Sequence, residues 1–138
     1  MSESVYEHWL RVRYAETDQM GVAHHASYLV YFEEARTRMM EAWGCSYADC
    51  EKAGVGLPVR RLEVRYRSSA FYDDELRVLT RVRDLRAASV TFDYELRRAS
   101  DDVLVATGWT ELACVDLHAA ERKVTPLPDS LRELLGRG

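Results

Sequence analysis

The chain has few cysteines, few prolines and almost no lysine, and these shortages narrow the classes of protein it can belong to. Its three cysteines, Cys45, Cys50 and Cys114, are odd in number and lack the short repeated spacing of a zinc site. We therefore expect reduced thiols, with no disulfide framework, no bound metal and no cofactor. Lys52 and Lys123 are the only lysines among 19 basic residues. This arginine excess is typical of genomic codon bias, although guanidinium groups also suit phosphate binding.

Long apolar runs and a net positive charge are also missing. No segment approaches the roughly 20 apolar residues of a transmembrane helix. The polar, acidic N-terminus lacks the basic and apolar regions of a secretion signal. The net charge of −4 disfavours general affinity for a nucleic-acid backbone. These absences predict a cytoplasmic protein with no stable membrane insertion and no nucleic-acid partner.

The size and composition predict one ordered domain covering residues 1–138. The chain is 47% hydrophobic and 30% charged. A disordered chain would need lower hydrophobicity and a larger net charge. One hydrophobic core is the usual solution at 138 residues, and no internal repeat or linker divides the sequence.

Hydrophobic periodicity predicts a strand, a loop, one long helix and then four strands. Residues 6–14 alternate with a period of two, and residues 15–25 interrupt that pattern as a loop. From residue 26 apolar side chains recur every three or four positions, which indicates a helix of about 18 residues ending at Gly44. A short helical segment over residues 47–53 follows. Alternation then predicts strands over residues 61–67, 76–83 and 90–97, an apolar strand over 103–115, and a short tail.

Three details of the long helix also follow from the pattern. Ser27 is a candidate N-terminal cap. Glu34 and Arg38 have the i,i+4 spacing of a favourable pair. Arg36 falls among the charged residues expected on the solvent side of the helix.

This order of elements predicts an α+β fold, with an antiparallel sheet wrapped around the long helix. The outer strands of such a sheet leave a row of unpaired backbone groups. Those edges must be paired or covered, which favours a dimer with a shared sheet.

One stretch of the sequence combines groups with a chemical use. Asp18 lies in the loop ahead of the helix, and Gly21 between them lets the backbone turn tightly. The first helical turn, around His25–Tyr28, exposes unpaired N–H groups that can polarise a carbonyl. A nearby carboxylate can deprotonate water or attack directly. Taken by residue type alone, a loop carboxylate is more often a cap of a turn or helix.

The same stretch carries a resemblance to a known family. The segment VRYAETDQMGVAHHASYL (residues 12–29), continuing through residue 37, closely resembles the 4-hydroxybenzoyl-CoA thioesterase family, and most of all its YbgC-type branch. The resemblance covers essentially the whole chain and is weaker over residues 57–58, 72–76 and 123–129. It implies a hotdog fold, a homodimer or homotetramer with active sites at the subunit interface, and hydrolysis of acyl-CoA to free acid and CoA.

The resemblance also assigns roles to residues. The catalytic aspartate of the family falls on Asp18, its branch-specific histidine on His25, and a tyrosine of the site on Tyr14. We expect further substrate-binding contacts from Gly21, His24, Ser27, Tyr28, Pro58 and Arg86. Some family members hold the CoA nucleotide with a basic cluster at the turn before the fourth strand. Here only Arg86 of that cluster is present, so Arg122 or Lys123 could contribute instead.

Three alternatives stay open at this point. Acyl-carrier-protein thioesters are a close variant of the acyl-CoA substrate. A hotdog dehydratase or hydratase would pair an acidic residue with a histidine around a β-hydroxyacyl chain, and the spacing from Asp18 to His24 or His25 suits it less well. A non-catalytic acyl-CoA-binding protein would have no need of Asp18. His24 and His25 are adjacent, so they lack the i,i+4 spacing of helical metal ligands.

Overall fold

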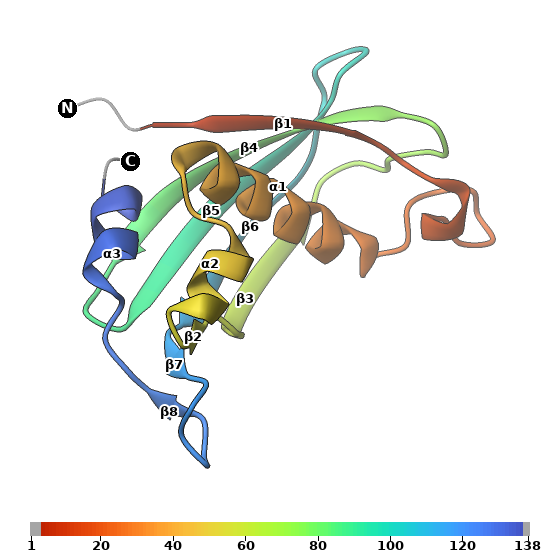
Figure 1. Ribbon diagram of the computed structural model, residues 1–138. Helices are drawn as coiled ribbons and strands as arrows, with labels where there is room; N and C mark the ends of the chain where they lie inside the picture. The colour runs from red at the N-terminus through yellow and green to blue at the C-terminus, as the bar shows by residue number, and fades with distance from the viewer. Residues whose placement is uncertain (1–3, 137–138) are drawn as a thin grey trace.

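The computed structural model describes residues 4–136 of the chain (Figure 1). Strands and helices follow one another as β1 (Tyr6–Arg11), the 3-10 helix η1 (Tyr14–Glu16), α1 (Ser27–Trp43), α2 (Tyr47–Lys52), β2 (Val55–Gly56), β3 (Val59–Tyr66), β4 (Glu75–Leu85), β5 (Ser89–Arg98), β6 (Leu104–Ala113), β7 (Val115–Asp116), β8 (Lys123–Val124) and α3 (Asp129–Leu135).

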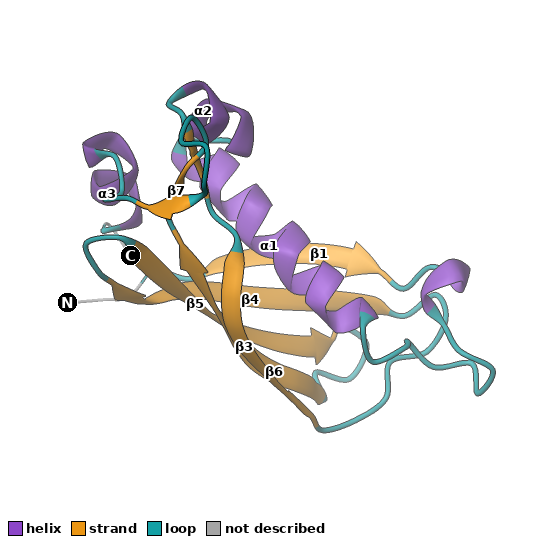
Figure 2. Ribbon diagram, turned by 90° about the horizontal axis from the view of Figure 1, so that it is seen from below, coloured by secondary structure: helices purple, strands orange, loops and turns teal. Residues whose placement is uncertain are grey.

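A five-stranded antiparallel sheet with the order β1-β4-β5-β6-β3 curves around α1 (Figures 1 and 2). A second, three-stranded sheet with the order β2-β7-β8 lies beside α2. The long helix therefore rests on one face of the main sheet. Strands β1 and β3 form the two edges of that sheet. This arrangement confirms the predicted α+β class and the hotdog architecture.

The first strand is shorter than its sequence pattern predicts. Alternation extends to Tyr14, but β1 ends at Arg11 and residues 14–16 form η1. Pairing continues as far as Val12, which donates to the Asp74 carbonyl. At the next residue the Glu16 carboxylate accepts the Arg13 N–H at 2.8 Å, which turns the chain out of the sheet.

The long helix ends as predicted but begins differently. Gly44 adopts φ +111°, the left-handed conformation typical of a helix C-terminus. Ser27 is the first helical residue and not the cap, because Ala26 occupies the cap position without a side-chain bond. The Ser27 hydroxyl instead donates to the Glu16 carbonyl at 3.0 Å, which ties the helix to the preceding loop.

The expected ion pair on α1 is also replaced. Arg38 pairs with Glu41, at 2.7 Å, rather than with Glu34. Glu34 pairs with His8 of β1, because the helix packs against that strand. Tertiary packing thus offers Glu34 a partner that lies 26 residues away in the sequence.

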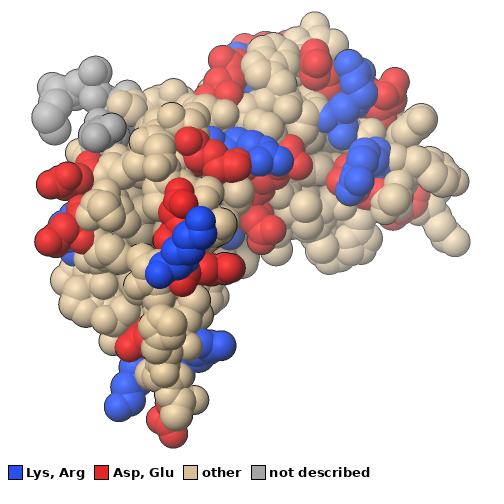
Figure 3. All heavy atoms as spheres, in the orientation of Figure 1, with Lys and Arg blue, Asp and Glu red and all other residues tan. Residues whose placement is uncertain are grey.

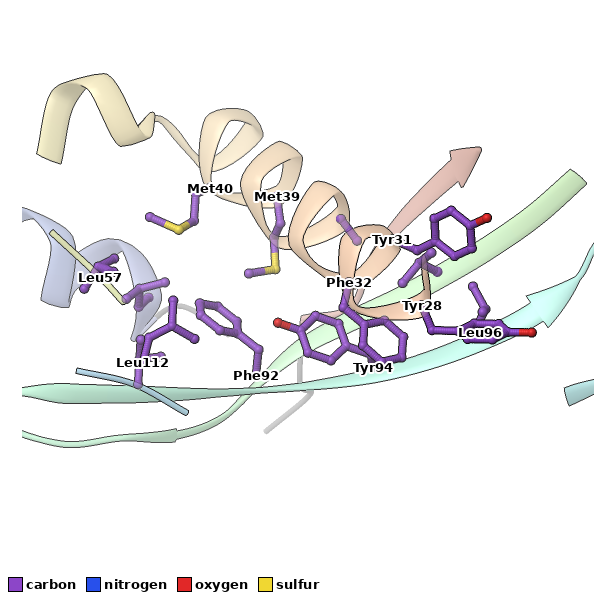
Figure 4. Packing of buried hydrophobic residues seen from close by; sticks show 14 of the residues in the cluster. Tyr28, Tyr31, Phe32, Met39, Met40, Leu57, Phe92, Tyr94, Leu96 and Leu112 are labelled. Atoms are coloured by element: carbon purple, nitrogen blue, oxygen red, sulfur yellow. The ribbon is translucent and has the colours of Figure 1, made fainter. Parts of the chain in front are cut away.

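The core lies between α1 and the concave face of the sheet (Figure 4). Phe32 of α1 stacks on Tyr94 of β5, with ring centroids 4.4 Å apart. Gly108 of β6 lies directly under Phe32, so the helix can approach the sheet closely at this point. Met39 and Met40 extend the same buried stripe toward the C-terminal end of α1.

Arg36 is buried, contrary to its expected place on the solvent side of α1. Only 4% of the residue is exposed. Its Nε donates to the Tyr47 hydroxyl at 3.1 Å and its Nη1 to the Tyr94 hydroxyl at 3.4 Å. Tyr94 is bonded in turn to Thr110 of β6. A hydrogen-bonded network of this kind allows a charged group to be buried, because it replaces part of the lost hydration.

The tail is helical, which the sequence pattern did not predict. Helix α3 buries Leu131, Leu134 and Leu135. Its Arg132 donates to the carbonyls of Arg86 and Ala87, at 2.9 and 2.7 Å, and so fixes the helix to the turn between β4 and β5. The predicted strand over residues 103–115 is divided as well, because the chain leaves the main sheet after Ala113 and enters the small one at Val115.

The surface carries charges of both signs. Blue and red spheres lie side by side over the face seen in Figure 3, as expected where arginines and carboxylates form local ion pairs. No helix within residues 4–136 has the length and apolar character needed to cross a membrane.

Candidate active site

The loop that carries Asp18 is a tight hairpin. The Asp18 N–H donates to the Val22 carbonyl at 2.9 Å, and the His24 N–H donates to the Glu16 carbonyl at 2.8 Å. Gly21 lies at the turn with φ +78°, a conformation that favours glycine, and has open space where a Cβ would be. This hairpin holds Asp18 in an ordered position immediately before α1.

The Asp18 carboxylate faces an open cavity. Its Oδ1 accepts the Met20 N–H at 2.8 Å, while Oδ2 has no partner within residues 4–136. The cavity measures about 830 Å³ and is lined, besides Asp18, by Tyr14, Ala15, Thr17, Gln19, Gly21 and Tyr72. One carboxylate oxygen is therefore available to a water molecule or a ligand.

The turn just before α1 contains a free backbone donor. The His24 N–H is already bonded to Glu16, and the Ala26 N–H is bonded to Nδ1 of His24 at 3.1 Å. Between them, the N–H of His25 donates to no acceptor in the described part of the chain. The His25 carbonyl accepts the Tyr66 hydroxyl at 2.8 Å, which fixes this peptide against the end of β3. An unpaired N–H just ahead of a helix lies at the positive end of the helix dipole, where it can polarise a carbonyl oxygen.

Tyr28, in the first turn of α1, lies close enough to Asp18 for the two groups to interact electrostatically. The residue is only 4% exposed and packs edge-on against Tyr66, with ring centroids 5.2 Å apart. Burial raises the pKa of Tyr28, and the nearby Tyr66 and the Asp18 carboxylate raise it further. Its phenol therefore stays protonated at neutral pH and lies within electrostatic reach of Asp18.

Two tyrosines line the mouth of the cavity. Tyr14 is 77% exposed, and its ring meets that of Tyr72 edge-on with centroids 5.8 Å apart. The sequence analysis assigned Tyr14 to the site but missed Tyr72. Local sequence patterns do not mark Tyr72, because the bridge between the adjacent Phe71 and Val22 of the Asp18 hairpin brings it to the site.

The structure places two of the predicted site residues in the Asp18 cavity and four others in the adjoining segment of the chain. Gly21 and Tyr14 share the Asp18 cavity, and His24, His25, Ser27 and Tyr28 follow it along the chain into α1. The rings of His24 and His25 lie against each other with centroids 4.1 Å apart. Within residues 4–136, no group of three or more His, Cys, Asp or Glu side chains is arranged to hold a metal ion.

Pro58 and Arg86 lie elsewhere in the same chain. Pro58 precedes β3, whereas Tyr66, at the other end of that strand, is the residue bonded to His25. A strand of this length spans roughly 25 Å. Arg86 follows the far end of β4 and its Nε donates to Asp84 at 2.8 Å. One subunit alone therefore does not bring Pro58 or Arg86 to Asp18.

Comparison with known proteins identifies the family. A model of the Thioesterase-like superfamily matches residues 12–135. The chain is 34% identical to the putative acyl-CoA thioesterase YneP of Bacillus subtilis over 107 residues, which are 78% of this chain and 77% of that protein. It is 30% identical to the acyl-CoA thioester hydrolase YbgC of Escherichia coli over 131 residues, 95% of this chain and 96% of the relative.

A solved structure agrees with these relatives. The crystal structure of Slr0204, a 1,4-dihydroxy-2-naphthoyl-CoA thioesterase from Synechocystis, superposes with a TM-score of 0.88 at 25% sequence identity and covers 96% of both chains. The matched region of the family model includes the Asp18 hairpin, α1 and the whole main sheet beyond β1. The chain therefore belongs to the Thioesterase-like superfamily.

Proposed function

We propose that this protein is an acyl-CoA thioesterase, which converts an acyl-CoA and water to a free carboxylic acid and CoA. Two observations carry the proposal: the free Oδ2 of Asp18 faces an open cavity, and the N–H of His25, seven residues further along the chain and just before α1, is unpaired within residues 4–136. The names of YneP, YbgC and Slr0204 as thioesterases or thioester hydrolases support the same substrate class.

The proposed reaction uses both groups. The thioester oxygen accepts the His25 N–H, so negative charge that develops there is stabilised. Asp18 either takes a proton from the attacking water or itself attacks the carbonyl carbon. The C–S bond then breaks and the sulfur leaves as a thiolate, which needs no strong acid. Where Asp18 is the nucleophile, this step leaves a mixed anhydride, and water then hydrolyses it to the free acid and restores the Asp18 carboxylate. In this scheme the side chains of Tyr14 and His25 orient the water and the substrate.

The test is release of free thiol by the wild-type protein. The substrates are butanoyl-CoA and benzoyl-CoA, and a colorimetric disulfide reagent detects the released thiol. We expect continuous thiol release from at least one of them. Loss of the enoyl absorbance of crotonyl-CoA without thiol release would favour a hydratase instead. Binding of acyl-CoA with neither reaction would favour a non-catalytic binding protein. The same assay on an acyl-carrier-protein thioester separates the two carriers.

We also propose that two copies pair through β3. This edge strand is exposed along most of its length, and Leu62 and Tyr66 on its helix side are 45% and 50% exposed. Two-fold pairing of identical edges is antiparallel. It would place the start of the second copy's β3 beside Tyr66, and so bring Pro58 of the partner subunit toward His25. Arg86 of the partner subunit lies at the same end of its sheet. A homotetramer and a cytoplasmic location stay predictions.

A proline on the free edge tests this dimer. The Arg67 N–H donates to the Val105 carbonyl of β6. Backbone N–H groups alternate in direction along a strand, so those of odd-numbered residues face β6 and the N–H of Leu62 faces outward. Leu62→Pro should therefore convert a wild-type dimer to a monomer, as measured by light scattering after size exclusion. Glu7→Pro, the matched change on the opposite edge strand β1, should leave the dimer intact. A monomeric wild-type protein, or a dimeric Leu62→Pro variant, would contradict the proposed pairing.

A further inference from the structure

Glu16 occupies a central place in the loop before α1. It ends η1, two residues ahead of Asp18. Its side chain is only 14% exposed, whereas the side chain of a glutamate is usually exposed to solvent. Nothing in the proposed chemistry uses this half-buried acidic group, so its contacts require a separate account.

The Glu16 carboxylate joins the loop to the second turn of α1. Its Oε1 accepts the Tyr31 hydroxyl at 3.0 Å and the Arg13 N–H at 2.8 Å. Its Oε2 accepts Nε of Arg13 at 3.2 Å. Burial raises the pKa of Tyr31 and the Glu16 carboxylate raises it further, so the phenol remains a donor. In Figure 4 the Tyr31 hydroxyl points away from the Phe32–Tyr94 stack.

The Glu16 carbonyl makes a second connection to the same helix. It accepts the His24 N–H at 2.8 Å and the Ser27 hydroxyl at 3.0 Å. Glu16 thus contacts the residue before His25, the first residue of α1 and, through Tyr31, the next turn. The distance between Asp18 and the free N–H of His25 depends on these bonds, because Asp18 lies two residues after Glu16 and His25 follows His24, which Glu16 contacts.

The alternative is that Glu16 is itself the reacting carboxylate. Two observations oppose it. Both Glu16 oxygens are bonded to donors of the chain, whereas one Asp18 oxygen has no partner within residues 4–136. Glu16 also faces a different hollow, a groove of about 360 Å³ between β1 and α1 that Asp18 does not line.

We infer that Glu16 is a positioning residue, which holds the Asp18 hairpin at the correct distance from the N-terminus of α1. The inference rests on the proposed thioesterase function. Displacing a reacting group by about 1 Å can cost up to about a hundredfold in rate, so a bond that fixes this distance affects turnover more than substrate binding. Its loss should therefore lower kcat with little change in KM.

The experiment compares Glu16→Ala, Glu16→Gln and Tyr31→Phe with the wild-type protein and Asp18→Asn in the thiol-release assay. Glu16→Ala should lower kcat about tenfold and change KM by less than about threefold. Glu16→Gln should stay within about threefold of wild type, because the amide oxygen still accepts from Tyr31 and from the Arg13 N–H, and the lost exposed ion pair contributes little. Tyr31→Phe should fall between them. Glu51→Gln, an exposed change on α2, serves as the control.

Hydrogen–deuterium exchange gives a readout that does not need activity. Amides of residues 16–26 should exchange faster in Glu16→Ala than in wild type, and at the wild-type rate in Glu16→Gln. If wild type releases no thiol, the proposed function fails while exchange still decides the role of Glu16. If Glu16→Ala does not fold, Tyr31→Phe decides it instead. Unchanged kcat and exchange in Glu16→Ala, or a Glu16→Gln variant as inactive as Asp18→Asn, would overturn the inference.

Discussion

Asp18→Asn should lower thiol release from acyl-CoA by roughly a hundredfold or more, the scale on which removal of a catalytic base or nucleophile acts. Asparagine keeps the shape of the side chain, and its amide oxygen can still accept the Met20 N–H that Asp18 Oδ1 accepts at 2.8 Å. The hairpin should therefore persist. What is lost is the negative charge that takes a proton from water or attacks the thioester.

The measurement is kcat and KM for the substrate that wild type hydrolyses fastest, with the unfolding midpoint recorded for each variant. Asp102→Asn is the matched control, because it makes the same chemical change at an exposed turn between β5 and β6. We expect that control to retain wild-type activity. A rate for Asp18→Asn equal to that of wild type would remove Asp18 from the mechanism, although the family assignment would stand.

Gly108→Ala should destabilise the whole domain. A Cβ at this position would lie 2.7 Å from the Glu63 carbonyl oxygen and 2.8 Å from Cε2 of Phe32. The backbone of β3 cannot rotate away as a flexible side chain would, and Phe32 is held by its stack on Tyr94. Overpacking of this kind typically costs about 1–3 kcal/mol in the free energy of unfolding.

Urea denaturation measures this loss as a lower midpoint with an unchanged slope. Thr107→Val, at the neighbouring position of β6, is the control, because its half-exposed side chain points to the opposite face of the sheet. That variant should unfold within about 0.5 kcal/mol of wild type. Equal midpoints for Gly108→Ala and wild type would show that α1 can move away from the sheet at no cost.

Parts of the fold could be read from local patterns. Period-two alternation identified β4 and β5, and the three-to-four spacing of apolar residues identified α1 up to Gly44. The prediction for β1 ran too far because alternation continues through Tyr14, and only the Glu16 carboxylate turns the chain at Arg13. A hydrogen bond to a side chain three residues on leaves no trace in hydrophobic periodicity.

The candidate site was also predictable only where its residues are close together in the sequence. Asp18, Gly21 and His25 lie within eight residues, so their order along the chain already places the carboxylate before the helix. Tyr72 was missed because its place beside Tyr14 depends on pairing between segments about fifty residues apart. Pro58 and Arg86 lie at the other end of the sheet, and their predicted role depends on a second copy of the chain.

By itself, the sequence determined the class of fold, the long helix and the acidic loop ahead of it, because turns and amphipathic periodicity are set by neighbouring residues. Tertiary structure alone decided that Arg36 is buried among tyrosine hydroxyls, that Ser27 bonds to Glu16 instead of capping α1, and that a tail rich in leucine packs as α3. Each of these outcomes depends on which partner a side chain meets after the sheet has closed around the helix, and residues distant in sequence supply most of those partners.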